Sequence, residues 1–217
     1  MGLDLEHLRW GLLQMIMLII SIGLHEFGHA WVADLRGDPL PRAQGRVTLN
    51  PFAHTDLIGT IAIPAVMIFL SPGFGLVGWG KPVLVSLPNP QTRRMDDLCI
   101  TLAGPAMNVV LCALFAVVGG LGGVDPRTHA DAYHFLRMGI MLNASLVVFN
   151  LLPIPPLDGS RVALRLGLFS EVTFMALARW GFVILLVLVN LPPFQLAMAF
   201  LRALAIWPWY SLWTLLS

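Results

Sequence analysis

The chain has 217 residues, of which 57% are hydrophobic and 12% charged, and its formal net charge is +1. Soluble domains usually contain about 25% charged residues, and the mean hydropathy here is +0.79. These values predict an integral membrane protein in a lipid bilayer and give no indication of nucleic-acid binding. The length allows five or six membrane-spanning helices of ~20 residues and little else, so we expect a single transmembrane domain over residues 1–217.

The first half of the chain is irregular in pattern. Residues 10–33 are almost wholly apolar and lack a basic leader and a cleavage site, so they predict a retained helix. A polar loop rich in turn-forming residues follows over 34–56. Residues 57–71 are apolar, but they are shorter than the ~17 residues that cross a bilayer easily. Residues 72–95 mix Gly and Pro with Val-rich pieces, which is typical of a strand or ribbon.

Longer apolar segments complete the chain, at about 98–122, 133–152, 172–190 and 194–216. The six hydrophobic segments predict an all-α polytopic membrane protein with about five full transmembrane helices. The short segment 57–71 and the loop after it would form a re-entrant region that is partly helical and partly strand-like.

One motif inside the first apolar segment can carry chemistry. Residues 24–29 read Leu-His-Glu-Phe-Gly-His, and histidines four residues apart lie on one helix face, where they can share a zinc ion. Glu26 leans toward that face and is placed to accept a proton from a water molecule there. On a soluble helix these residues would be ordinary exposed groups. In an apolar segment they are costly and indicate a functional site.

Catalytic zinc usually takes three protein ligands, so a further ligand is needed. Candidates in or beside apolar segments are His54, Asp56, His134, Asp158 and Glu171. Asp158 is favoured, because the prolines before it interrupt a helix and Gly159 permits a sharp turn. Such a broken helix can turn a carboxylate inward at membrane depth. The alternative is that Asp158 caps the next helix at the membrane surface.

The charge distribution gives an independent indication of topology. For Asp158 to meet the histidines, 10–33 and 133–158 must end on the same side, which requires 57–71 to be re-entrant. That side then carries Arg36, Arg42, Arg46, Lys81, Arg93, Arg94, Arg161 and Arg165, and the other carries Arg9, Arg127 and at most Arg137. A full crossing would leave the two sides nearly balanced. The positive-inside rule therefore favours an active site near the cytoplasmic face.

Three motifs follow one another along the chain: His-Glu-Phe-Gly-His at 25–29, Ala-Gly-Pro-Ala-Met-Asn at 103–108, and Asn-Leu-Leu-Pro-Ile-Pro-Pro-Leu-Asp-Gly at 150–159. Together, and in this order, they resemble the site-2 protease family of intramembrane zinc metalloproteases. The loop 45–51 with His54 resembles a small bacterial subgroup. The chain would be a member without a PDZ or cytosolic regulatory domain, with a catalytic core over about 10–160 and accessory helices over about 172–216.

The resemblance implies specific roles for these residues. His25, His29 and Asp158 would bind one zinc ion per chain, and Glu26 would be the general base. Asn150 would lie in the cleft and hold the substrate or the developing oxyanion. From the residues alone, Asn150 is more simply explained by an interhelical hydrogen bond.

The implied activity is endopeptidase cleavage within or near transmembrane segments of membrane-anchored proteins, as in regulated intramembrane proteolysis. Because a helical substrate hides its peptide bonds, we expect it to bind unwound, with Val83 and Val85 pairing to it by strand addition. His54 is most simply part of a loop pair or cap, and a substrate-binding role for it is a second possibility.

Several alternatives stay open at this point. Asn108 and Asn143 would either line a water channel or pack helices together, and packing is favoured. A regulatory protein partner is compatible with the sequence. The other class of function is a zinc-binding transporter or non-proteolytic scaffold, against which the presence of Glu26 argues, because metal transport needs no general base.

Overall fold

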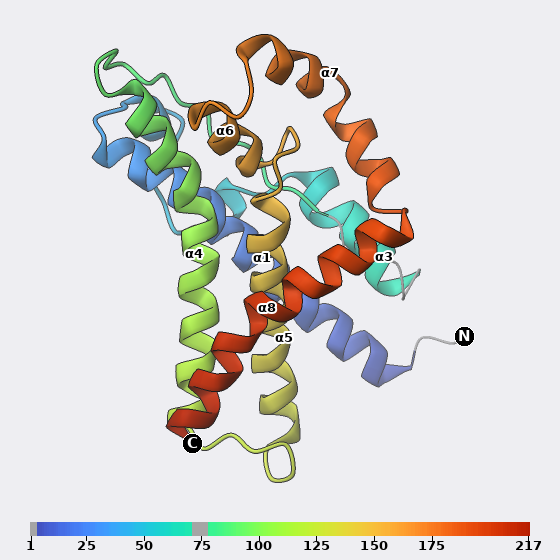
Figure 1. Cartoon of the computed structure of the whole chain (residues 1–217). Coiled ribbons are helices and arrows are strands. Elements are labelled where there is room, and N and C mark those ends of the chain that lie inside the picture. The colour runs from blue at the N-terminus through green and yellow to red at the C-terminus, as the bar shows by residue number, and fades with distance from the viewer. Residues whose placement is uncertain (1–3, 71–77) are drawn as a thin grey trace. The chain divides into compact units, whose positions relative to one another are not determined.

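The computed structural model describes residues 4–70 and 78–217, and within them every regular element is a helix (Figure 1). The chain divides into two compact units, Met1–Pro88 and Asn89–Ser217. Four helices of the described residues are long and apolar enough to cross a membrane: α1, α4, α5 and α7. The prediction of an all-α polytopic membrane protein is therefore confirmed.

The first unit is built on α1 (Leu5–Leu35), a helix of 31 residues. Asp4 caps it, because its carboxylate accepts a hydrogen bond from the His7 backbone N–H at 2.7 Å. At 1.5 Å per residue the helix is about 46 Å long, more than the ~30 Å of bilayer hydrocarbon. The expected helix over 10–33 is thus present and begins one turn earlier.

The loop expected over 34–56 is present, but part of it packs against α1. It contains α2 (Leu40–Ala43) and a 3-10 turn, η1 (Pro51–Ala53). Pro51 lies against Gly23 of α1, where a Cβ atom would come within 2.9 Å of the Pro51 Cβ. Gly23 is ~18 Å of helix rise before the end of α1. The loop therefore runs back along α1, and the missing side chain of Gly23 allows this close approach.

Residues 57–71 form a short broken helix as far as they are described. A π-helix, η2 (Leu57–Ala62), leads directly into α3 (Ile63–Phe69). Six and seven residues together rise only ~20 Å, which is too short to cross the hydrocarbon core. Pro64 lies in the first turn of α3 and has no N–H to donate to the preceding η2, where the Gly59 carbonyl accepts from the Trp79 N–H instead.

The strand or ribbon expected over 72–95 is absent from the described part of that range, which is a loop up to the start of α4. Residues 71–77 lie outside the described residues, residues 78–89 form no regular element, and α4 begins at Arg93. The backbone groups of this loop bond to side chains and to other loops rather than to a partner strand. The prediction of a strand or ribbon is therefore wrong for the described residues of this segment.

The second unit is a helical bundle. Its helices are α4 (Arg93–Leu121), α5 (Ala130–Asn150), α6 (Asp158–Arg165), α7 (Glu171–Leu188) and α8 (Pro192–Leu216). α4, α5 and α8 pack against one another around Ala116, Leu136, Ile140 and Trp213 (Figure 1). Gly119 lies against the Trp213 ring, so a small residue lets two helices approach closely.

A pair of asparagines joins α4 to α5 inside this bundle. The Asn108 side-chain amide donates to Asn143 Oδ1 at 2.9 Å, and the Asn143 amide donates to the Gly139 carbonyl at 2.9 Å. Both side chains are fully buried. This arrangement supports the packing interpretation of Asn108 and Asn143 over the water-channel interpretation, because their polar groups satisfy each other.

Candidate active site

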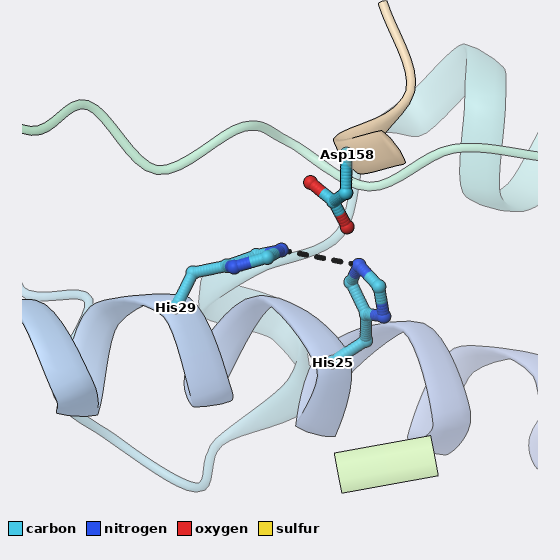
Figure 2. A group of neighbouring side chains, drawn as sticks. All are labelled: His25, His29 and Asp158. Atoms are coloured by element: carbon cyan, nitrogen blue, oxygen red, sulfur yellow. Dashed lines mark hydrogen bonds between the residues drawn. The ribbon is translucent and has the colours of Figure 1, made fainter. Parts of the chain in front are cut away.

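α1 places the two motif histidines on one face. Their Nε2 atoms are 3.1 Å apart and their ring centroids 4.8 Å apart, with both rings buried (Figure 2). Two nitrogens each ~2.05 Å from a tetrahedral zinc ion would be about 3.3 Å apart. The spacing of His25 and His29 therefore fits two ligands of one metal ion, as the motif predicted.

Glu26, the predicted general base, is half-buried on the same helix and packs against Gly80. A Cβ atom on Gly80 would lie 2.8 Å from the Glu26 Cγ atom and 3.1 Å from its Oε1 atom. The loop over residues 78–82, which we call the Gly80 wall, therefore packs directly beside the Glu26 carboxylate. Nothing in the local sequence pattern indicated this contact.

The Gly80 wall is fixed to the first half of the chain on both of its sides. On one side the Trp79 N–H donates to the Gly59 carbonyl at 3.1 Å, and the Thr60 hydroxyl donates to the Trp79 carbonyl at 2.7 Å. On the other side the Lys81 N–H donates to the His54 carbonyl at 2.8 Å. Bonds on either side leave the Gly80 backbone little freedom to move.

The same loop is anchored further along by polar side chains. The Gln44 amide donates to the Leu84 carbonyl at 3.1 Å. Asp38 is 1% exposed, and its carboxylate accepts hydrogen bonds from the backbone N–H groups of Ser86, Leu87 and Leu40 and from the Ser86 hydroxyl. Burial by itself would raise the pKa of Asp38, but these hydrogen bonds outweigh it and hold the pKa below its usual 3.8.

Arg46 is a buried cation within the first unit, at 4% exposure. Its guanidinium donates to the Ala53 carbonyl at 2.5 Å and to the Pro82 carbonyl at 3.2 Å. It is also close enough to Glu26 for the two opposite charges to attract each other. Buried charges need such compensation. Arg46 therefore joins the loop after α1 to the Gly80 wall, beside the candidate base.

His54 is fully buried, and its Nε2 atom lies 3.0 Å from the Thr48 carbonyl. Its own carbonyl is the acceptor for Lys81. The side chain thus fixes the loop around η1, and it is Asp56, not His54, that caps the following helix η2. The substrate-binding role of His54 stays a prediction, as do those of Val83 and Val85, whose side chains are half-buried.

Asp158, the third residue labelled in Figure 2, belongs to the second unit, where it is the first residue of α6. Gly159 after it packs so closely on the Leu151 carbonyl that a Cβ atom would overlap it. At the other end of α6, the Arg165 guanidinium donates to the buried Asp97 carboxylate at 2.5 Å. The sequence prediction of a sharp turn before this carboxylate is confirmed.

Asn150 is the last residue of α5, and its amide donates to the Leu146 carbonyl at 3.0 Å. In this state the amide bonds within its own helix, so the predicted role in holding a substrate stays a prediction. The interhelical hydrogen bond suggested by the residue type alone is also not the bond that the structure gives this amide.

Sequence reasoning missed Gly80, Arg46, Asp38 and Gln44, which together support the site in the first unit. Their long-range contacts join residues about 35 to 55 positions apart, and a single sequence does not display such pairings.

The family model for peptidase family M50 matches residues 13–124 and 125–188. The Bacillus subtilis protein named "Putative zinc metalloprotease YwhC" is 36% identical over 187 residues, covering 82% of this chain and 80% of that protein. The Mycolicibacterium smegmatis protein named "Putative zinc metalloprotease Rip2" is 35% identical over 177 residues, covering 80% of this chain and 65% of that protein. No solved structure gives a significant match.

These matches and the membrane-length helices define an integral membrane zinc metalloprotease. The chain belongs to peptidase family M50, the site-2 protease family. The resemblance seen in the three sequence motifs is thereby confirmed.

Proposed function

We propose that this protein is an intramembrane zinc endopeptidase that hydrolyses peptide bonds within or near the transmembrane segments of membrane-anchored proteins. The observation that carries the proposal is the pairing of His25 and His29, with Glu26 between them, inside a helix of membrane-spanning length and composition. A protease with its base on such a helix meets its substrate at the depth of the bilayer. Its products would be the released parts of regulatory membrane proteins.

His25, His29 and Asp158 would hold one zinc ion per chain. The donor set fits the metal, because two imidazoles and a carboxylate leave a coordination position open for catalysis. When bound, zinc supplies a Lewis acid that polarises the scissile carbonyl and makes water a better nucleophile near neutral pH. The rest of the mechanism depends on the chain's own residues.

Glu26 accepts the proton of the attacking water at a carboxylate oxygen and delivers it to the leaving amine nitrogen. The Asn150 amide donates to the carbonyl oxygen as negative charge develops there. To do so it must exchange its hydrogen bond with the Leu146 carbonyl for one to the substrate.

Substrate holding is assigned to the loop around Val83 and Val85. The Gln44 amide engages Leu84 from one edge of this loop. In an extended backbone, successive residues direct their N–H and C=O groups to opposite edges, so those of Val83 and Val85 would serve an unwound substrate on the other edge. His54 supports this loop from behind through the Lys81 N–H. A regulatory protein partner is a further part of the proposal.

The proposed location is a bacterial inner membrane with the site near the cytoplasmic face. The charge asymmetry along the sequence supports this orientation.

Changing Glu26 to Gln tests the chemistry. The variant keeps the shape of the side chain and both histidines, so it should bind zinc as the wild type does. It should lose about 10² to 10⁴-fold in rate, because Gln cannot accept the water proton. Zinc content is measured by mass spectrometry, and hydrolysis is followed with fluorescently labelled casein in detergent. Normal hydrolysis by this variant would show that Glu26 is not the base.

A second assay tests whether the enzyme cleaves a substrate at the depth of the membrane. The enzyme is reconstituted in vesicles with a single-span protein whose apolar segment carries a central Gly-Pro pair, and products are located by mass spectrometry. Val83→Pro and Val85→Pro should each abolish cleavage there while zinc content is unchanged, because proline removes the N–H that pairs with a strand. Cleavage that survives both changes would exclude strand pairing at this loop.

A further inference from the structure

Position 80 of the Gly80 wall is occupied by glycine, and the neighbouring Glu26 side chain leaves no room there for a Cβ atom. Gly80 approaches α1 so closely that a Cβ atom would lie 2.8 Å from both Glu26 Cγ and Ile22 Cγ2, and 3.1 Å from Glu26 Oε1. Separations under about 3 Å force a shift, and the Glu26 side chain is the more flexible of these neighbours. Any larger residue at 80 would therefore displace the carboxylate.

The backbone at Gly80 has little scope to retreat from α1 instead. Trp79 is bonded through both its N–H and its carbonyl to Gly59 and Thr60 of η2. Its ring packs on Gly59 so tightly that a Cβ atom there would overlap it. Lys81 on the other side is bonded to the His54 carbonyl at 2.8 Å. Three separate bonds within the first unit thus hold the position of Gly80.

Arg46 completes the support. Its buried guanidinium bonds to the Ala53 carbonyl beside His54 and to the Pro82 carbonyl two residues after Gly80. Its charge also attracts the Glu26 carboxylate. The Arg46 side chain is therefore bonded both to the loop that holds Lys81 and to the Gly80 wall, and its charge attracts the Glu26 side chain that the wall contacts.

We propose that Gly80 is a positioning residue for Glu26, and that Arg46 acts with it by clamping the wall through the Pro82 and Ala53 carbonyls. This inference rests on the proposed role of Glu26 as the base. On this inference, a loop more than 50 residues further along the chain sets the direction of the Glu26 carboxylate from outside α1. An error of about 1 Å in a catalytic group costs on the order of 10²-fold in rate.

The direct test is Gly80→Ala, with Gly78→Ala as the matched control. Gly78 lies in the same loop and is also tightly packed, since a Cβ atom there would be 2.9 Å from the Gly59 carbonyl oxygen, but its close neighbours do not include Glu26. With labelled casein in detergent, Gly80→Ala should lower kcat by about 30-fold or more and change KM less than threefold. Zinc content should stay at the wild-type level. Gly78→Ala should lower kcat at least fivefold less than Gly80→Ala does, because its methyl group meets the Gly59 carbonyl that anchors Trp79 and does not meet the Glu26 side chain.

A second measurement does not depend on activity. The loss in thermal midpoint caused by Gly80→Ala should be smaller by about 2 °C or more in a Glu26→Ala background, because the overlap with Cγ and Oε1 is removed. Equal losses in both backgrounds would show that Glu26 is not what the new methyl group meets. Arg46→Lys should share the kcat phenotype, because one ammonium cannot reproduce the guanidinium's fork of two carbonyl bonds.

The outcomes separate this inference from the proposed function. If Glu26→Gln is inactive while Gly80→Ala hydrolyses casein as fast as the wild type, the positioning role is wrong and the function stands. If Gly78→Ala and Gly80→Ala lose kcat equally, the effect belongs to the loop and not to the Glu26 contact, which also overturns the inference. Normal activity of Glu26→Gln would instead overturn the proposed function.

Discussion

At the residue scale, the first unit shows how ionisable groups are placed where water is scarce. Asp38 is 1% exposed, yet its carboxylate is satisfied by three backbone N–H groups and one hydroxyl. The Arg46 guanidinium donates to two carbonyls, and burial lowers its pKa while the charge of Glu26 offsets part of that effect. Both groups hold the chain after α1 to the loop beside the base, so each polar residue contributes to stability and to the site.

Asp38 gives a pH-dependent prediction. Its folded-state pKa lies below its unfolded value of ~3.9, so its contribution to stability is fully present above that value and is lost as pH falls through the folded pKa. Asp38→Asn should lower stability by about 2 kcal/mol at pH 7, because an amide NH₂ would face the Ser86 and Leu87 donors. The difference in thermal midpoint between wild type and variant should shrink below pH 4. A difference that stays constant down to pH 3 would contradict this account.

The candidate site residues that the sequence alone singled out are those whose pattern is local. His25, Glu26 and His29 lie within one helical turn, so their spacing on α1 followed from the period of the helix. Asp158 was found because proline and glycine mark a break next to a carboxylate. Gly80 could not be found in this way, since its role depends on contact with Glu26, 54 positions away.

At the element scale, short pieces of the chain support the part of the site that the long helix α1 carries. The loop over 34–56 was expected from its composition to be polar and rich in turns, and in the structure its η1 turn packs on α1 at Gly23. Asn50, Thr48, Thr55 and Asp56 each bond to nearby backbone groups. Such local bonding lets an irregular loop approach apolar surroundings, and composition alone does not reveal it.

The ion pair at the end of α6 gives a prediction for that element. The Asp97 side chain is 1% exposed and that of Arg165 is 24% exposed, so removing the buried partner leaves a partly solvated charge without its counter-ion. Asp97→Ala should cost about 2 kcal/mol, less than a fully buried pair would, and lower the thermal midpoint by about 4 °C.

Glu171→Gln is the control for that prediction. Glu171 contacts the same arginine at 3.7 Å but is 79% exposed, and exposed pairs contribute little. Its thermal midpoint should stay within about 1 °C of the wild type. If Glu171→Gln costs as much as Asp97→Ala, the burial of Asp97 is not what makes the pair matter.

At the scale of the whole molecule, composition predicted the class of protein, and the helices of the described residues confirm it. The expected boundaries of α4, α5 and α7 are close to those observed, because long apolar segments between Gly and Pro clusters leave few alternatives. The region between α1 and α4 was predicted least well. The loops of this region are joined by hydrogen bonds from single side chains such as those of Gln44 and Asp38. Such bonds follow no periodic pattern in the sequence.

The central claim is that His25, His29 and Asp158 bind one zinc ion. It is tested most directly by X-ray absorption at the zinc edge of the purified wild type and Asp158→Ala proteins. The wild type should contain one zinc per chain, with two imidazole nitrogens at ~2.0–2.1 Å and oxygen ligands completing the shell. Asp158→Ala should lose one oxygen ligand and bind zinc at least tenfold more weakly. An unchanged spectrum with unchanged zinc affinity in Asp158→Ala would contradict the account.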